Sequence, residues 1–121
     1  MIEKTLARRY AVALLKATEA EGTTEDVEQS LRALREVWRS NRPFRSVLAQ
    51  PRVPKAKKAA LLRKPFEGRT SRAFLTFLDL LIERNRQAII PDVAEVFDLL
   101  ADATRGEVRV KVRTWKPLTD A

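Results

Sequence analysis

The chain has 121 residues, of which 45% are hydrophobic and 33% are charged, and this composition indicates one soluble globular domain with its own core. It contains no Cys and no His, which excludes disulfides, thiolate metal sites, cysteine nucleophiles and the usual general base. The 24 basic and 16 acidic residues give a net charge of +8, which allows nucleic acid, anionic lipid or an acidic protein as a partner.

The first two predicted helices are separated by a glycine. The first helix runs from about Ile2 to Ala20, and Gly22 ends it in the position typical of a C-terminal glycine. Thr23 or Thr24 can cap the second helix, which has a single apolar face. That face carries Val27, Leu31, Leu34, Val37 and Trp38.

Prolines bound the third and fourth predicted helices. Ser40 or Asn41 can cap the third helix, which is short and stops at Pro51. The fourth helix opens near Pro54 and ends before Pro65.

The fifth and sixth predicted helices complete the bundle. Thr70 or Ser71 can cap the fifth helix, which extends to about Arg86. Pro91 opens the sixth helix, and Gly106 ends it. Its inward face carries Val93, Val96, Phe97 and Leu100.

The C-terminal tail has a different pattern. From residue 108, valine alternates with arginine or lysine, and this period of two predicts a strand. Because the chain offers no second strand, we expect the tail to pair with another chain or to be disordered. The predicted fold class is therefore all-α, a six-helix bundle with a short C-terminal strand-like tail. Residues 1–106 would form a helical N-terminal domain, and residues 107–121 a linker or the first strand of a truncated C-terminal domain.

The first and fifth predicted helices carry more apolar surface than one stripe. On a helical wheel their apolar side chains span roughly 220° each, against about 100° for a one-sided surface helix. We assign one stripe of each helix to the core: Ala7, Ala11, Leu14 and Leu15 in the first, and Phe74, Leu75, Leu78, Leu81 and Ile82 in the fifth. The surplus flank of the first helix is Leu6, Tyr10, Ala13 and Ala17, and that of the fifth is Ala73, Phe77 and Leu80 with Arg84 beside them.

Two explanations of the surplus apolar flanks remain open. Both helices could be central in the bundle and buried on two sides. Alternatively, a groove between them could receive an amphipathic helix of another protein, with the basic surface favouring acidic groups on that partner. Periodicity alone is compatible with both explanations.

Enzyme chemistry and cofactor binding receive no support from the sequence. The serines have no histidine to activate them, no carboxylates have metal-ligand spacing, and the glycine-containing stretches do not match a phosphate loop. Basic residues from Arg52 to Lys64 could lie along phosphates, although they lack interleaved aromatic residues. A small RNA-binding helical module of the antitermination-factor kind is therefore the alternative function.

Several short stretches occur in the order and spacing of a known family. The first helix contains ARRYAVAL, with Ala7, Arg8, Tyr10, Ala11, Ala13 and Leu14. The fifth contains FLDLLIERNR, with Phe77, Leu78, Leu80, Leu81, Glu83 and Arg86, followed by Ile90, Pro91, Val93 and Phe97. Between them lie Pro51, Val53, Lys58 and Leu62, and the tail ends in Pro117, Leu118 and Thr119. Together they resemble the δ subunit of F-type ATP synthases, whose mitochondrial relative is the oligomycin-sensitivity-conferring protein. Arg84 and Gln50 stand where that family has asparagine.

The resemblance implies a stator subunit without catalytic activity, cofactor or metal. It implies an N-terminal six-helix bundle that sits on the α3β3 head and binds the N-terminal helix of an α subunit between its first and fifth helices. A C-terminal domain would contact the b subunits. Neither nucleic-acid binding nor membrane insertion is expected, and the location would be the cytoplasmic face of the inner membrane. The family's groove residues match Tyr10, Ala13 and Leu80, and helix geometry adds Leu6, Ala17, Ala73, Phe77 and Arg84.

Overall fold

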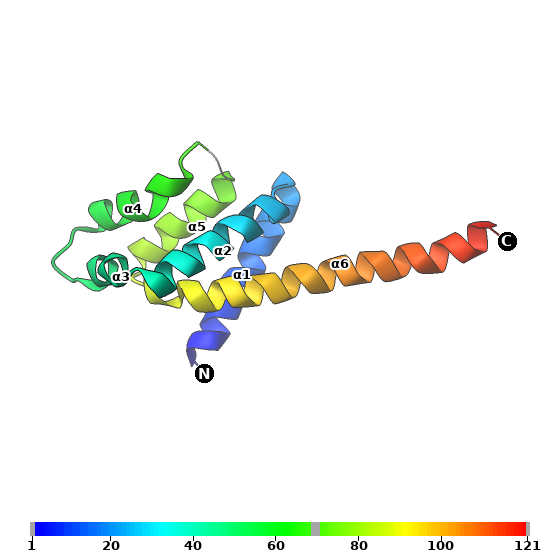
Figure 1. Cartoon of the computed structure of the whole chain (residues 1–121), viewed down its shortest axis with the longest axis horizontal. Coiled ribbons are helices and arrows are strands. Elements are labelled where there is room, and N and C mark those ends of the chain that lie inside the picture. Colours follow the sequence, from blue (N-terminus) through cyan, green and yellow to red (C-terminus); the bar gives the residue numbers. More distant parts are fainter. Residues whose placement is uncertain (1, 69–70, 121) are drawn as a thin grey trace.

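The computed structural model describes the backbone of residues 2–68 and 71–120 and the side chains of residues 4–68 and 71–106. Over this part of the chain the fold is all-α, as predicted, and no strand is present (Figure 1). The helices are α1 (Ile2–Glu21), α2 (Thr24–Ser40), α3 (Arg42–Ala49), α4 (Lys55–Arg63), η1 (Lys64–Phe66), α5 (Arg72–Glu83), η2 (Gln87–Ile89) and α6 (Ile90–Asp120).

Side-chain caps begin α3 and α5 at positions that the sequence predicts. At α3, Asn41 Oδ1 accepts a hydrogen bond from the Phe44 amide at 3.0 Å. At α5, Ser71 Oγ accepts one from the Phe74 amide at 2.9 Å. Thr70, the alternative cap for α5, lies outside the described residues. Each cap satisfies an amide of the first turn that has no partner within its own helix.

The turn between α1 and α2 is built on a left-handed glycine. Gly22 has a φ of +75°, which a residue without Cβ adopts freely, and this confirms the predicted end of the first helix. The amide of Gly22 donates to the Glu19 carbonyl at 3.3 Å, and the amide of Thr23 donates to the Thr18 carbonyl at 2.9 Å. Thr23 does not cap α2 through its side chain, because its hydroxyl donates to the Glu21 carboxylate at 2.9 Å.

The hydrophobic core is built from α1, α2, α5 and α6, with single leucines from α3 and α4. The core stripe assigned to the first helix is confirmed, since all four of its residues are buried. The stripe of α5 needs one correction, because Leu75 is only half-buried whereas Phe77 is buried. At 100° per residue, the buried arc of α5 is centred on Phe74 and includes Phe77, and this leaves Leu75 at its edge. The largest fully buried side chains are Phe74, Phe97, Leu31, Leu48, Leu62, Leu78, Leu81 and Ile90.

The predicted C-terminal strand is wrong, because α6 continues as one helix from Ile90 to Asp120 and extends beyond the other helices (Figure 1). Gly106, expected to end this helix, does not have a positive φ. An isolated strand leaves its amides and carbonyls without partners in the chain, whereas a helix pairs them within its own segment. The hydrogen-bonding requirement therefore outweighs the alternating side-chain pattern of residues 107–113.

A buried carboxylate ties α2 to α6. Glu28 of α2 is only 3% exposed and forms ion pairs with Arg32, at 3.3 Å, and with Arg105 of α6. Arg32 also pairs with Asp98 of α6 at 3.3 Å. Burial opposes ionisation, but hydrogen bonds from Arg105 and Asp98 and the charges of both arginines keep the pKa of Glu28 below its ordinary value. Burial and the nearby Glu28 raise the pKa of Asp98.

We expect Glu28→Gln to lower the free energy of unfolding by about 1–2 kcal/mol at neutral pH, because charged hydrogen bonds are lost while both arginines can rehydrate. A carboxylate whose pKa is lower in the folded state contributes stability above its unfolded-state pKa, and this is lost as the pH falls through its folded-state pKa. The difference between the two proteins should therefore close on acidification through and below the ordinary glutamate range. Because Glu28 is one cause of the raised pKa of Asp98, Glu28→Gln also removes part of that shift, and the pH dependence reports both carboxylates. Urea unfolding followed by circular dichroism at a series of pH values measures this difference.

The matched control for this prediction is Glu36→Gln on the exposed side of α2. Glu36 pairs with Arg39 at 2.9 Å, and both side chains are mostly exposed. Water replaces such a pair at little cost, so we expect no measurable change in stability. The lowered pKa assigned to Glu28 would be contradicted if Glu28→Gln left the free energy of unfolding unchanged, or if it changed that energy by the same amount at every pH.

Candidate functional site

Helices α1 and α5 run antiparallel and are joined at both ends of their contact. At one end, Arg84 Nη1 donates to the Tyr10 hydroxyl at 3.3 Å. At the other, Glu21 Oε2 accepts from the Ala73 amide at 3.2 Å. Between these contacts lies a groove of about 360 Å³ with a largely apolar lining. Its lining residues are Tyr10, Ala13, Leu14, Ala17, Glu21, Arg72, Ala73, Thr76, Phe77 and Leu80.

The floor of the groove is aromatic, and its walls are small or aliphatic. The rings of Tyr10 and Phe77 meet edge to face, with centroids 6.3 Å apart, and both side chains are largely buried. On the α1 wall, Ala17 is exposed, and on the α5 wall, Leu80 is half-buried. Small side chains let a second helix approach closely, and a large ring with a polar tip is typical of interfaces. The groove therefore has the shape and chemistry to hold an apolar helix face.

The structure brings together most of the groove residues that the sequence predicts. Leu6 and Arg84 lie outside the lining: Leu6 is half-buried and packs against the core, whereas Arg84 is exposed and contacts the Tyr10 hydroxyl. The lining also contains Leu14, which the sequence assigns to the core stripe only. The six predicted residues that do line the groove are Tyr10, Ala13, Ala17, Ala73, Phe77 and Leu80.

Three lining residues that the sequence analysis did not single out are polar. Thr76 lies three residues after Ala73 and four before Leu80, so the spacing of the helix could have identified it. Glu21 and Arg72 close the end of the groove where α1 ends and α5 begins. Their position depends on how the two helices pack, and the sequence carries no signal for that.

Local hydrogen bonds hold both ends of the groove in place. Asn85 has a φ of +57° and ends α5, and the Arg86 amide donates to the Leu81 carbonyl at 2.7 Å, so the backbone that carries Arg84 is fixed. At the other end, a hydrogen bond with the Ser71 side chain, followed by one from the Thr23 hydroxyl, lowers the pKa of Glu21. Glu21 is therefore a fixed, ionised group beside the start of α5.

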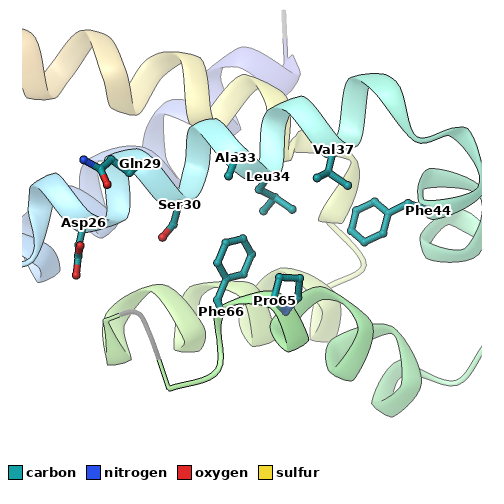
Figure 2. A pocket seen from close by; sticks show the side chains of 9 residues that line it. All are labelled: Asp26, Gln29, Ser30, Ala33, Leu34, Val37, Phe44, Pro65 and Phe66. Atoms are coloured by element: carbon teal, nitrogen blue, oxygen red, sulfur yellow. The ribbon is translucent and has the colours of Figure 1, made fainter.

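A second apolar hollow, of about 380 Å³, lies between α2, α3 and η1 (Figure 2). The ring of Phe66 points from η1 toward the face of α2 that carries Leu34 (Figure 2). It also packs edge to face on Phe74, with ring centroids 5.1 Å apart. The α1–α5 groove is bordered by two long helices. This hollow is bordered by one long helix, α2, and otherwise by the short α3 and η1.

The α1–α5 groove has a mainly apolar lining. Within residues 4–68 and 71–106, no three acidic side chains gather closely enough to hold a metal ion. No helix in the described part of the chain combines the length and apolar character needed to cross a membrane. The groove offers a largely apolar surface with one charged end, formed by Glu21 and Arg72.

The sequence matches the family model of the ATP synthase delta (OSCP) subunit over residues 6–121. It is 36% identical to the ATP synthase subunit delta of Shouchella clausii over 121 residues, which is 100% of this chain and 67% of that protein. The corresponding protein of Bacillus subtilis is 35% identical over 100% of this chain and 66% of its own length. The ATP synthase subunit delta of Salinibacter ruber is 34% identical over 120 residues, which is 99% of this chain and 63% of that protein. The chain thus spans about two thirds of the length of the curated relatives it matches.

Proposed function

This chain belongs to the ATP synthase delta (OSCP) subunit family, and on that premise we propose that it is a stator component that holds the N-terminal helix of an α subunit in the groove between α1 and α5. The observation that carries the proposal is the apolar groove itself. A helix docked there would cover the ring edges of Tyr10 and Phe77 and the side chain of Leu80. The RNA-binding alternative rests on the basic residues from Arg52 to Lys64, which lack interleaved aromatic side chains for stacking on bases.

Apolar burial gives such a contact the strength that a stator needs. Rotation of the central shaft exerts torque on the catalytic head, and a stator contact must keep the head from turning. At roughly 25 cal/mol per Å², burying about 500 Å² of apolar surface gives around 12 kcal/mol before the costs of association and ordering are subtracted. A helix in a groove fits this task because it resists sliding through the shape of its side chains.

The remaining assignments of the proposal concern the whole assembly. The subunit is non-catalytic and acts by binding alone. It lies on the cytoplasmic face of the inner membrane as a peripheral part of the complex. We expect contact with the b subunits through a C-terminal domain, and the relatives are longer than the matched region by about a third of their length.

A titration with an α-subunit peptide tests the proposal. The probe is the first 20 or so residues of the cognate α subunit, which form about 30 Å of helix when docked. We expect calorimetry to give one site per chain with a dissociation constant in the micromolar range or below. Amide shifts in nuclear magnetic resonance spectra should concentrate at α1 and α5.

Two outcomes would contradict the proposed site. Absence of peptide binding would remove the function proposed for the groove. Amide shifts centred on the hollow between α2 and η1 would move the site to that hollow. The residues around Val37 and Phe66 serve as reporters for that second outcome.

A further inference from the structure

Cationic side chains gather on the outer side of α1, next to the groove. A shallow surface hollow there is lined by Thr5, Arg8, Arg9, Val12, Ala13 and Lys16. It shares Ala13 with the α1–α5 groove, so the two hollows meet along one edge of α1. We call Arg8, Arg9 and Lys16 the basic ledge, and all three side chains are exposed.

The charges of the basic ledge are not compensated by carboxylates of the described residues. Five arginines of the described residues do pair with carboxylates, among them Arg32 with Asp98 at 3.3 Å and Arg63 with Asp79 at 3.4 Å. None of the salt bridges within residues 4–68 and 71–106 involves a member of the ledge. The lining of its hollow contains three cations and no acidic side chain. This uncompensated charge makes the ledge complementary to anions on whatever lies beside it.

The spacing of the ledge suits the flank of a docked helix. Arg9 and Lys16 are seven residues apart on α1, which places them two turns and about 10.5 Å apart along its axis. Ala13 lies between them and opens onto the groove. A second helix that lies along the groove passes the ledge side by side, and its own residues seven positions apart have the same spacing.

We propose that the basic ledge selects a partner helix with an acidic flank, so that the occupant of the groove carries carboxylates beside its apolar stripe. The inference rests on the proposed function, and it adds the charge pattern by which the partner is recognised. The apolar groove supplies most of the affinity. Because the ledge is exposed and bordered by water, its contribution is to the rate of association and to the register of the helix.

The experiment compares two double variants of the 121-residue chain that each lose two positive charges. Arg9→Gln with Lys16→Gln removes the ledge charges. Lys57→Gln with Lys64→Gln is the control, since these lysines are also exposed and seven residues apart but lie on α4 and η1. Both variants have the same net charge, so a difference between them reports local charge and not the overall field.

We expect the ledge variant to bind the cognate α-subunit peptide with an association rate roughly three- to tenfold below that of the control at low salt. The difference should vanish in concentrated salt, because screening removes the attraction between exposed charges. Stopped-flow fluorescence with a labelled peptide measures these rates. Equal rates for the two variants would overturn the inference and leave the proposed function standing.

A second peptide, in which every Asp and Glu is replaced by its amide, identifies the group that is recognised. We expect this peptide to associate with the unmodified chain as slowly as the acidic peptide associates with the ledge variant. When the amide peptide is combined with the ledge variant, the association rate should not fall any further. An amide peptide that associates as fast as the acidic one would overturn the inference. Failure of the unmodified chain to bind either peptide would overturn the proposed function together with the inference.

Discussion

Ala17→Asp and Leu80→Asp are each expected to weaken binding of the α-subunit peptide by at least about a hundredfold. Both side chains line the groove, one from each wall. A docked apolar helix would remove the new carboxylate from water, at a cost of several kcal/mol. Calorimetric titration of each variant with the peptide measures the change in the dissociation constant.

Folding is expected to survive these two substitutions, because Ala17 is exposed and Leu80 is only half-buried. The matched control is Ala60→Asp on α4, where an exposed alanine lies away from the groove. It should bind the peptide as the unmodified chain does. Unchanged binding by a folded Leu80→Asp variant would show that the partner helix does not lie in this groove.

Phe74→Ala is expected to lower the free energy of unfolding by about 3–5 kcal/mol, because it removes a fully buried ring and leaves a cavity. The ring packs edge to face on Phe66, with centroids 5.1 Å apart, and stacks on Phe77 at 6.3 Å. Both contacts disappear in the variant. Domains of this size have a total stability of only 5–15 kcal/mol in general, so a large share of it would be lost.

Urea unfolding monitored by circular dichroism tests this prediction, with Leu99→Ala as the control. Leu99 is 64% exposed on α6, and its removal should change stability by less than about 0.5 kcal/mol. A Phe74→Ala variant as stable as this control would mean that the aromatic cluster does not form the centre of the core. The groove variants should remain folded under conditions in which Phe74→Ala is partly unfolded.

The sequence is a reliable guide wherever a local interaction decides the structure. The end of α1 follows from Gly22, which adopts the left-handed conformation there, and the start of α5 follows from the Ser71 cap. The one-sided α2 buries Val27, Leu31 and Leu34 as its pattern predicts, whereas Val37 of the same predicted face is 39% exposed. In these cases the groups that interact are within a few residues of one another, so their chemistry is readable from the chain.

The strand predicted for the tail is wrong because a strand depends on a partner that is not local in the chain. The valine alternation after Gly106 is typical of a strand, but a strand needs a neighbouring strand, and α6 needs only its own backbone. A side-chain pattern therefore predicts a strand correctly only when a partner strand is present.

What the sequence by itself determined is the all-α class, the helix order and the existence of two helices with surplus apolar surface. Only the tertiary structure decided which of these surplus apolar side chains are buried and which line an open groove. Periodicity gives the direction of each side chain around its own axis, but not which neighbour occupies that direction. Packing of α1 against α5 made Phe77 part of a buried floor, left Leu75 at the edge of the core, and kept Ala17 and Leu80 at an open groove.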